Sequence, residues 1–139
     1  MISRVLVPMD ESALAEQALK YALEAHPGAE ITVLHVVGEP SPMMGKAVRL
    51  ALEDNPERAA KKQAEELLGR ADDIAAEYDA GVDTDVAFGH PAKVIVDRSE
   101  EYDLVVIGSH GGSFVDRLFV GDVAETIFRR APVPVVVVR

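Results

Sequence analysis

Short apolar runs alternate along the chain with longer segments in which apolar residues recur at helical spacing. The apolar runs predict strands, because a strand covered on both faces reads as continuous apolar sequence. They lie at residues 4–8, 31–37, 82–88, 104–107 and 135–138, and the third of them alternates apolar with polar residues. The segments with an apolar stripe predict helices. They lie at residues 14–25, 56–78, 91–101 and 122–130.

Residues that stop or start helices fall between these segments. Asp10 and Ser12 both precede the first predicted helix, and either of them can cap it. Gly81 follows the long helix and is predicted to end it, while Pro91 stands at the first position of the next one. Residues 38–55 carry no clear periodicity, and their length favours a flap over a site rather than a tight connection.

Strands that alternate with helices predict an α/β fold in a single domain, residues 1–139. The expected architecture has three layers: a doubly wound sheet of five parallel strands with helices on both faces. Ligands of such sheets bind at the carboxyl ends of the strands, where the strand order reverses. Asp10, Val36, Gly89 and Gly108 all follow predicted strands, so they are expected to meet at one crevice.

The glycines after the fourth strand indicate an anion site. Gly108 and Gly111 allow the backbone to turn and present N–H groups, and Gly121 precedes a predicted helix N-terminus. Oriented amides together with a helix N-terminus favour a phosphate. The spacing is neither that of a dinucleotide fingerprint nor that of a P-loop. On spacing alone, ordinary turn and helix-start chemistry accounts for these glycines equally well.

The charge balance narrows the classes of partner. The net charge is −10, which argues against nucleic acid and against an anionic membrane, because both require a basic face. No apolar run approaches the length that spans a membrane, and the first strand pattern begins at once, so we expect no signal peptide and a cytoplasmic protein. There is no cysteine, which excludes disulfides and thiolate metal sites.

Several segments, in their order and spacing, carry a resemblance to a known family. They are Val5-Leu6-Val7-Pro8-Met9-Asp10-Glu11-Ser12, Leu34-His35-Val36-Val37, Gly89-His90-Pro91, the run from Asp103 to Gly111, Gly121-Asp122-Val123-Ala124-Glu125, and the run from Ala131 to Arg139. With these segments the sequence resembles the universal stress protein family over nearly its whole length. Some members of that family bind ATP and others do not.

The resemblance implies the adenine nucleotide alpha hydrolase-like fold and a crevice for ATP or another adenine nucleotide. Asp10 matches the acidic residue beside the nucleoside, with Pro8 as a neighbouring contact, and Val36 matches the residue whose backbone reads the adenine. The residues that match the loop around ribose and phosphates are Ile107, Gly108, Ser109, His110, Gly111, Gly112 and Ser113. Gly121, Asp122 and Val123 match the second phosphate-contacting segment.

One position departs from the ATP-binding pattern. Asp122 stands where those members carry Ser or Thr, and an ionised carboxylate cannot donate a hydrogen bond to phosphate. Mg²⁺ can bridge the carboxylate to phosphate, salt can screen the repulsion, or Asp122 can simply cap the helix. Two functions therefore stay open. The first is an adenine-nucleotide binder for stress-linked sensing or regulation, with or without Mg²⁺. The second is a nucleotide-free dimeric scaffold for a partner protein.

Three further expectations concern assembly, chemistry and one histidine. Val135, Val136, Val137 and Val138 form a strand expected at the sheet edge, where it invites a second copy, and the resemblance also implies a homodimer through this strand. No side chain of the glycine loop is an evident base for activating water, so the protein is not expected to be an enzyme, or at most a slow ATPase. His35 lies inside an apolar strand and is expected to be a core histidine with a hydrogen-bond partner rather than a ligand.

Overall fold

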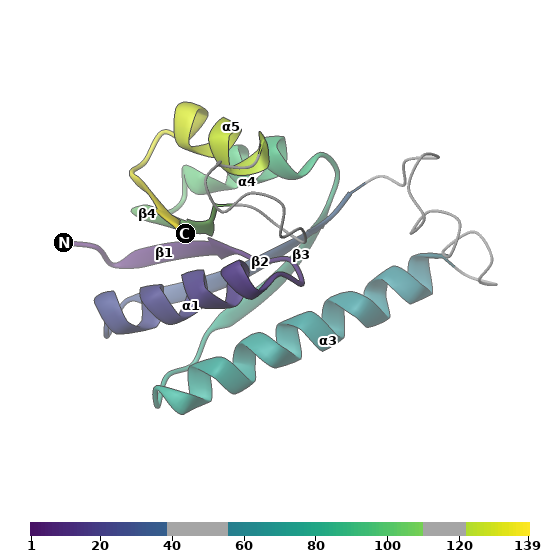
Figure 1. The fold of residues 1–139 in the computed structure, drawn as a ribbon, viewed down its shortest axis with the longest axis horizontal. Helices are drawn as coiled ribbons and strands as arrows, with labels where there is room; N and C mark the ends of the chain where they lie inside the picture. The colour runs from purple at the N-terminus through teal and green to yellow at the C-terminus, as the bar shows by residue number, and fades with distance from the viewer. Residues whose placement is uncertain (39–55, 110–121) are drawn as a thin grey trace.

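The sheet has the architecture that the sequence predicts. The computed structural model (Figure 1) describes residues 1–38, 56–109 and 122–139. Its five parallel strands pair in the order β3-β2-β1-β4-β5. Their bounds are β1 Arg4–Pro8, β2 Glu30–Val37, β3 Asp83–Phe88, β4 Leu104–Gly108 and β5 Val135–Val138. β5 lies at an edge of the sheet, as expected for the last strand.

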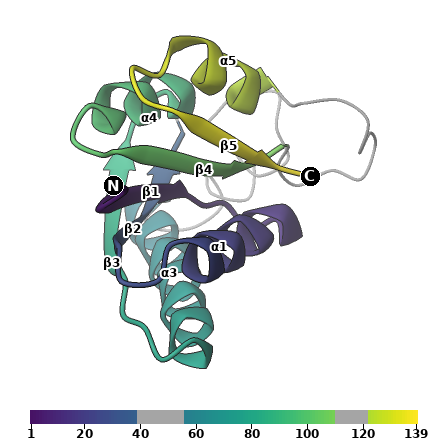
Figure 2. The ribbon, with the colours of Figure 1, turned by 90° about the vertical axis from the view of Figure 1, so that its left-hand side faces the viewer.

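Helices cover both faces, so the three-layer α/β prediction is confirmed. α1 (Ala13–Ala25) and α3 (Pro56–Glu77) lie on one face of the sheet, and α4 (Pro91–Ser99) and α5 (Asp122–Arg130) lie on the other (Figure 2). Within the described part of the chain, none of these helices is both long and apolar enough to cross a membrane.

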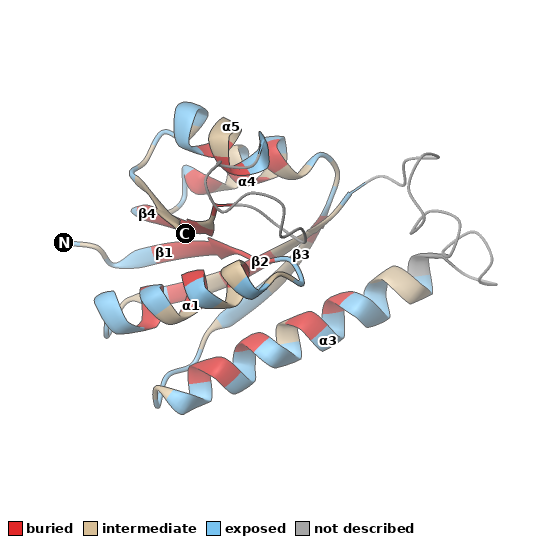
Figure 3. Cartoon of the chain, viewed as in Figure 1, coloured by how far each residue is buried: buried red, intermediate tan, exposed pale blue. Residues whose placement is uncertain are grey.

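Successive residues of β1 belong to two separate hydrophobic cores, one on each face of the sheet. Val5 and Val7 pack with α1 and α3, whereas Leu6 between them packs with α4 and α5. All three are almost completely buried, and Figure 3 shows the burial concentrated on the strands and on the inner sides of the helices. Burial on both faces is why the central strands read as unbroken apolar runs.

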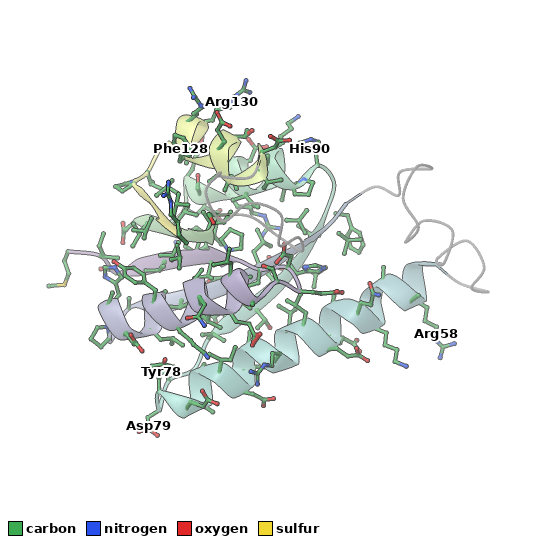
Figure 4. The ribbon with its side chains drawn as sticks, viewed as in Figure 1. Arg58, Tyr78, Asp79, His90, Phe128 and Arg130 are labelled. Carbon is green, nitrogen blue, oxygen red and sulfur yellow. The ribbon has the colours of Figure 1, made fainter. Side chains whose placement is uncertain are left out.

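The end of α3 corrects a prediction. The helix stops at Glu77, and the residue in the left-handed conformation is Asp79, with φ of 54°, rather than Gly81 (Figure 4). The N–H of Ala80 donates to the carbonyl of Ala75 at 3.0 Å and closes the helix end. Aspartate tolerates this conformation better than most residues because its short polar side chain bonds locally, so a glycine is not required. The helix predicted over residues 91–101 likewise ends earlier, at Ser99. The flap predicted for residues 38–55 lies outside the described residues, except for its first residue.

Candidate functional site

A cavity of about 590 Å³ lies at the carboxyl ends of β1, β2 and β4. The first residues of α1, α4 and α5 complete its walls. β1 and β4 are neighbours in the sheet, and the chain leaves them toward opposite edges, so this is the point where the strand order reverses. The cavity is lined by Pro8, Met9, Asp10, Ser12, Ala15, Leu34, His35, Val36, Pro91, Ile95, Ile107, Gly108, Asp122, Val123 and Ala124.

The cavity brings together the described residues that the sequence singled out, with two exceptions, Ser109 and Gly89. Those that line it are Pro8, Asp10, Val36, Ile107, Gly108, Asp122 and Val123. Ser109 is not among the lining residues, since it is fully buried and its N–H donates to the carbonyl of Val138 at 2.8 Å. That amide is therefore already used by β5. Gly89 was expected at the crevice but is not among the lining residues, because it follows β3 at the far edge of the sheet, where its N–H donates to the carbonyl of Val37 at 3.1 Å. His110, Gly111, Gly112, Ser113 and Gly121 lie outside the described residues, and their roles stay predictions.

The turn between β1 and α1 forms one wall and is held at each step by a hydrogen bond. The N–H of Met9 donates to the carbonyl of Leu34 at 2.9 Å, which extends the pairing of β1 with β2. Asp10 Oδ1 accepts the N–H of Ser12 at 2.8 Å, and Ser12 Oγ accepts the N–H of Ala15 at 3.1 Å. Ser12 is thus the helix cap, and Asp10 shapes the turn before it.

His35 is a lining residue that the sequence interpretation assigned to the core. It is half-buried, and its Nδ1 lies 2.9 Å from the carbonyl oxygen of Met9, so the expected hydrogen-bond partner is present. It nevertheless borders the cavity. Strand periodicity predicts that a residue lies within a strand, but it does not reveal that a residue near the carboxyl end of β2 borders a cavity.

The remaining lining residues were not predicted as site residues, although each lies near the end of a predicted strand or the start of a predicted helix. They are Met9, Ser12, Ala15, Leu34, Pro91, Ile95 and Ala124. Their position beside the predicted strand ends is the signal that identifies them.

Gly108 has a packing role that spacing did not reveal. A Cβ at this position would lie 3.0 Å from both the carbonyl carbon and the Cβ of Leu14, and 3.1 Å from the Leu14 carbonyl oxygen. Among the described glycines, positive φ angles occur at Gly28 and Gly89 and not at Gly108. Glycine is therefore required here because the first turn of α1 approaches β4 closely.

The cavity walls are mostly apolar, with a few polar side chains. Two carboxylates, Asp10 and Asp122, line the cavity, and both residues are exposed. No lysine or arginine is present among the described lining residues. Within the same described ranges, no three His, Asp or Glu side chains come together as a metal site. The remaining lining is mostly aliphatic, as in many small-molecule sites.

Comparison with known proteins places the chain in a family. The model described as the universal stress protein family matches residues 1–139. Universal stress protein MJ0531 of Methanocaldococcus jannaschii is 29% identical over 143 residues, which cover 100% of this chain and 83% of that relative. The solved structure of universal stress protein UspA from Lactobacillus plantarum aligns with a TM-score of 0.79 at 22% identity, over 99% of this chain and 98% of that one.

Two solved structures of similar likeness contain adenine nucleotides. A universal stress protein in complex with cAMP has a TM-score of 0.71 at 24% identity, covering 99% of this chain and 97% of that one. The universal stress protein from Archaeoglobus fulgidus in complex with dAMP has a TM-score of 0.69 at 21% identity, covering 100% and 98%. At these identities the structural likeness shows the fold alone. The family model spans the whole chain, however, and the chain therefore belongs to the universal stress protein family.

Proposed function

We propose that this universal stress protein binds an adenine nucleotide, ATP or AMP, in the cavity between β1 and β4. The binding of the nucleotide, rather than its hydrolysis, would be the signal. The protein would act in the cytoplasm, in stress-linked sensing or regulation. The observation that carries the proposal is the cavity itself, whose volume of about 590 Å³ lies within the range of small-molecule sites. The complexes of family members with cAMP and dAMP support the same ligand class.

The walls suit the two halves of a nucleotide differently. Aliphatic side chains such as Leu34 and Ile95 offer an apolar surface to a purine ring. α5 begins at Asp122, so its first amides and the positive end of its dipole face the same space and favour a phosphate. The nucleoside then lies toward β1 and β2, and the phosphates lie toward β4 and α5.

Mg²⁺ fits the site only as a companion of the nucleotide. The described lining offers two carboxylates, Asp10 and Asp122, and Mg²⁺ is commonly held by one or two carboxylates together with substrate phosphates. The ion would supply positive charge between Asp122 and the phosphates. Any hydrolysis would be slow, because the described lining offers no arginine or lysine to stabilise charge on a transferring phosphoryl group.

Isothermal titration calorimetry with AMP, ATP and Mg-ATP tests the proposal directly. We expect binding of at least one of these ligands with a dissociation constant of roughly micromolar to millimolar, the range for a small ligand with few charge-assisted contacts. Excess absorbance at 260 nm in freshly purified protein would show a nucleotide retained more tightly than this, and it is easily read because the chain has no tryptophan. Absence of binding by both the wild-type protein and Asp122→Ser would refute the proposal.

A second function, the nucleotide-free dimeric scaffold, is favoured by Asp122 alone. This residue places a carboxylate in the cavity beside the predicted phosphate position. If that carboxylate excludes nucleotides, the cavity would have no nucleotide ligand, and the protein would instead bind a partner protein. Binding by Asp122→Ser together with no binding by the wild-type protein would support this second function.

The position of β5 at the edge of the sheet supports the homodimer that the sequence predicts. The N–H of Val105 donates to Pro134 O and the N–H of Ser109 donates to Val138 O, so alternate β5 residues face β4. The backbone groups of Val135 and Val137 therefore point away from the sheet. We propose that a second copy pairs there around a two-fold axis.

The substitution Val137→Pro is expected to disrupt the dimer without disrupting the fold of the subunit. Proline removes an outward N–H that an intermolecular ladder needs, while the bonds from β4 to Pro134 and Val138 stay intact. Light scattering at micromolar protein is expected to show a dimer for the wild type and a monomer for Val137→Pro, with unchanged circular dichroism. Val137→Thr keeps the N–H and the β-branched shape, and it should remain dimeric. A Val137→Pro dimer would place the interface elsewhere.

A further inference from the structure

We propose that His35 contacts the ligand by accepting a hydrogen bond from the nucleoside, and that the Met9 carbonyl fixes His35 in this acceptor role. The inference rests on the proposed function and adds a specificity residue to it. Its starting point is a single contact, in which the Nδ1 of His35 lies 2.9 Å from the carbonyl oxygen of Met9.

That contact determines which ring nitrogen carries the proton. A carbonyl oxygen can only accept, so Nδ1 must be the N–H of this pair. A neutral imidazole has one N–H, and the other nitrogen is then an acceptor. The Met9 carbonyl thereby makes Nε2 of the neutral ring a lone-pair acceptor.

Nε2 is accessible, and it belongs to a residue that lines the cavity. His35 is half-buried and lines the cavity, and within the described residues its Nε2 has no hydrogen-bond partner. No buried side-chain nitrogen or oxygen in that part of the chain lacks a partner, so Nε2 is not sealed inside the protein. An accessible acceptor at a cavity wall is a group that a ligand can meet.

The chemistry of this wall selects the part of the ligand that faces it. Asp10 follows Met9 on the turn between β1 and α1, and its carboxylate is likewise an acceptor, with Oδ1 already occupied by the N–H of Ser12. Phosphate oxygens are also acceptors, so two acceptors on one wall repel them and favour neutral donors. The donors of an adenine nucleotide are the ribose hydroxyls and the exocyclic amino group. We therefore assign to His35 a contact with one of these nucleoside donors and not with phosphate.

The substitution His35→Asn separates the two ring nitrogens. The asparagine amide N–H₂ lies near the position of Nδ1 and can still donate to the Met9 carbonyl, but nothing replaces Nε2. Calorimetry would compare AMP with three analogues that each alter one donor: 2′-deoxy-AMP, 3′-deoxy-AMP and inosine monophosphate. The wild type is expected to bind one analogue roughly 3- to 10-fold more weakly than AMP, as for one lost hydrogen bond. His35→Asn should bind AMP more weakly by a similar factor and lose the discrimination against that analogue.

His35→Gln provides the complementary control. Its longer side chain brings an amide oxygen toward the Nε2 position, so it should regain part of the discrimination while losing the donor to Met9. The midpoint of thermal unfolding should accordingly fall in His35→Gln and stay near the wild-type value in His35→Asn.

The outcomes distinguish this inference from the function on which it rests. Equal weakening of all four ligands by His35→Asn, or unchanged discrimination, would overturn the role of His35 and leave nucleotide binding in place. Binding of no nucleotide by either the wild type or Asp122→Ser would overturn the proposed function, and the role of His35 with it.

Discussion

Replacing Asp122 with serine is expected to tighten the binding of metal-free ATP by about ten- to a hundredfold. A unit charge about 4 Å from a phosphate charge costs about 1 kcal/mol in bulk water and about 4 kcal/mol at an effective dielectric of 20. Asp122 lines the cavity but is exposed, so the effect lies nearer the first limit for each phosphate charge. Several phosphate charges raise the sum, and serine adds a hydroxyl that can donate. Calorimetry in low salt measures the change.

The pattern across ligands and ions should identify repulsion as the cause. The gain should be smaller for AMP than for ATP, because AMP brings less charge to the cavity. It should shrink with Mg²⁺, which places positive charge between carboxylate and phosphate, and with molar salt, where the screening length falls to about 3 Å.

The matched control for this change is Asp72→Ser. Asp72 is an exposed residue of α3, and none of the α3 residues whose side chains the structure describes lines the cavity. The control makes the same change in net charge, so it should leave the ATP affinity within about twofold of the wild type, since distant exposed charges are screened. Equal affinities of the wild type and Asp122→Ser would show that Asp122 only begins α5 and that the phosphates lie elsewhere.

The layout of the fold was predictable from the sequence because its signals are local. A strand covered on both faces must be apolar throughout, and β1 and β4 show this plainly. A helix that covers one face needs an apolar stripe, and α1 and α3 carry one. The positions of Asp10, Val36 and Gly108 at strand ends place them at one edge of a parallel sheet, and all three line the cavity. Gly89, which follows the edge strand β3, was expected with them but does not line it.

The parts of the site that were not predictable depend on contacts between distant residues. His35 and Met9 are 26 positions apart, and only the pairing of β1 with β2 brings the ring to the carbonyl. Gly108 meets Leu14 because α1 packs against β4. The amide of Ser109 is used by β5, which follows it by many residues. None of these contacts produces a periodic pattern of apolar residues in the sequence.

The contact of Gly108 with Leu14 leads to the largest stability effect that we expect. Gly108→Ala adds a Cβ that would lie 3.0 Å from two atoms of Leu14, and those atoms must move. Overpacking of this kind costs about 1–3 kcal/mol, so the midpoint of thermal unfolding should fall by roughly 3–12 °C. Because Gly108 also lines the cavity, a shift of β4 against α1 should weaken nucleotide binding as well. Thermal melts followed by circular dichroism, with and without AMP, measure both effects.

Gly69→Ala is the matched control, since it adds the same methyl group elsewhere. Gly69 is an exposed residue inside α3, and a Cβ there would meet nothing within 4 Å. It should therefore stabilise the protein by about 0.5–1 kcal/mol, the ordinary gain of alanine over glycine in a helix. Loss of stability by Gly108→Ala with a gain by Gly69→Ala would show that contact, and not the methyl group itself, decides the sign.

A second substitution tests where the strain in Gly108→Ala arises. The Leu14 atoms that the new Cβ would meet are the carbonyl carbon, the carbonyl oxygen and the Cβ, all of which alanine retains. Leu14→Ala should therefore fail to rescue Gly108→Ala, and the two free-energy changes should add to within about 0.5 kcal/mol. Rescue by Leu14→Ala would mean that the outer part of the leucine side chain fills the contact. The close approach of the α1 backbone to β4 would then not be what demands a glycine at this wall of the cavity.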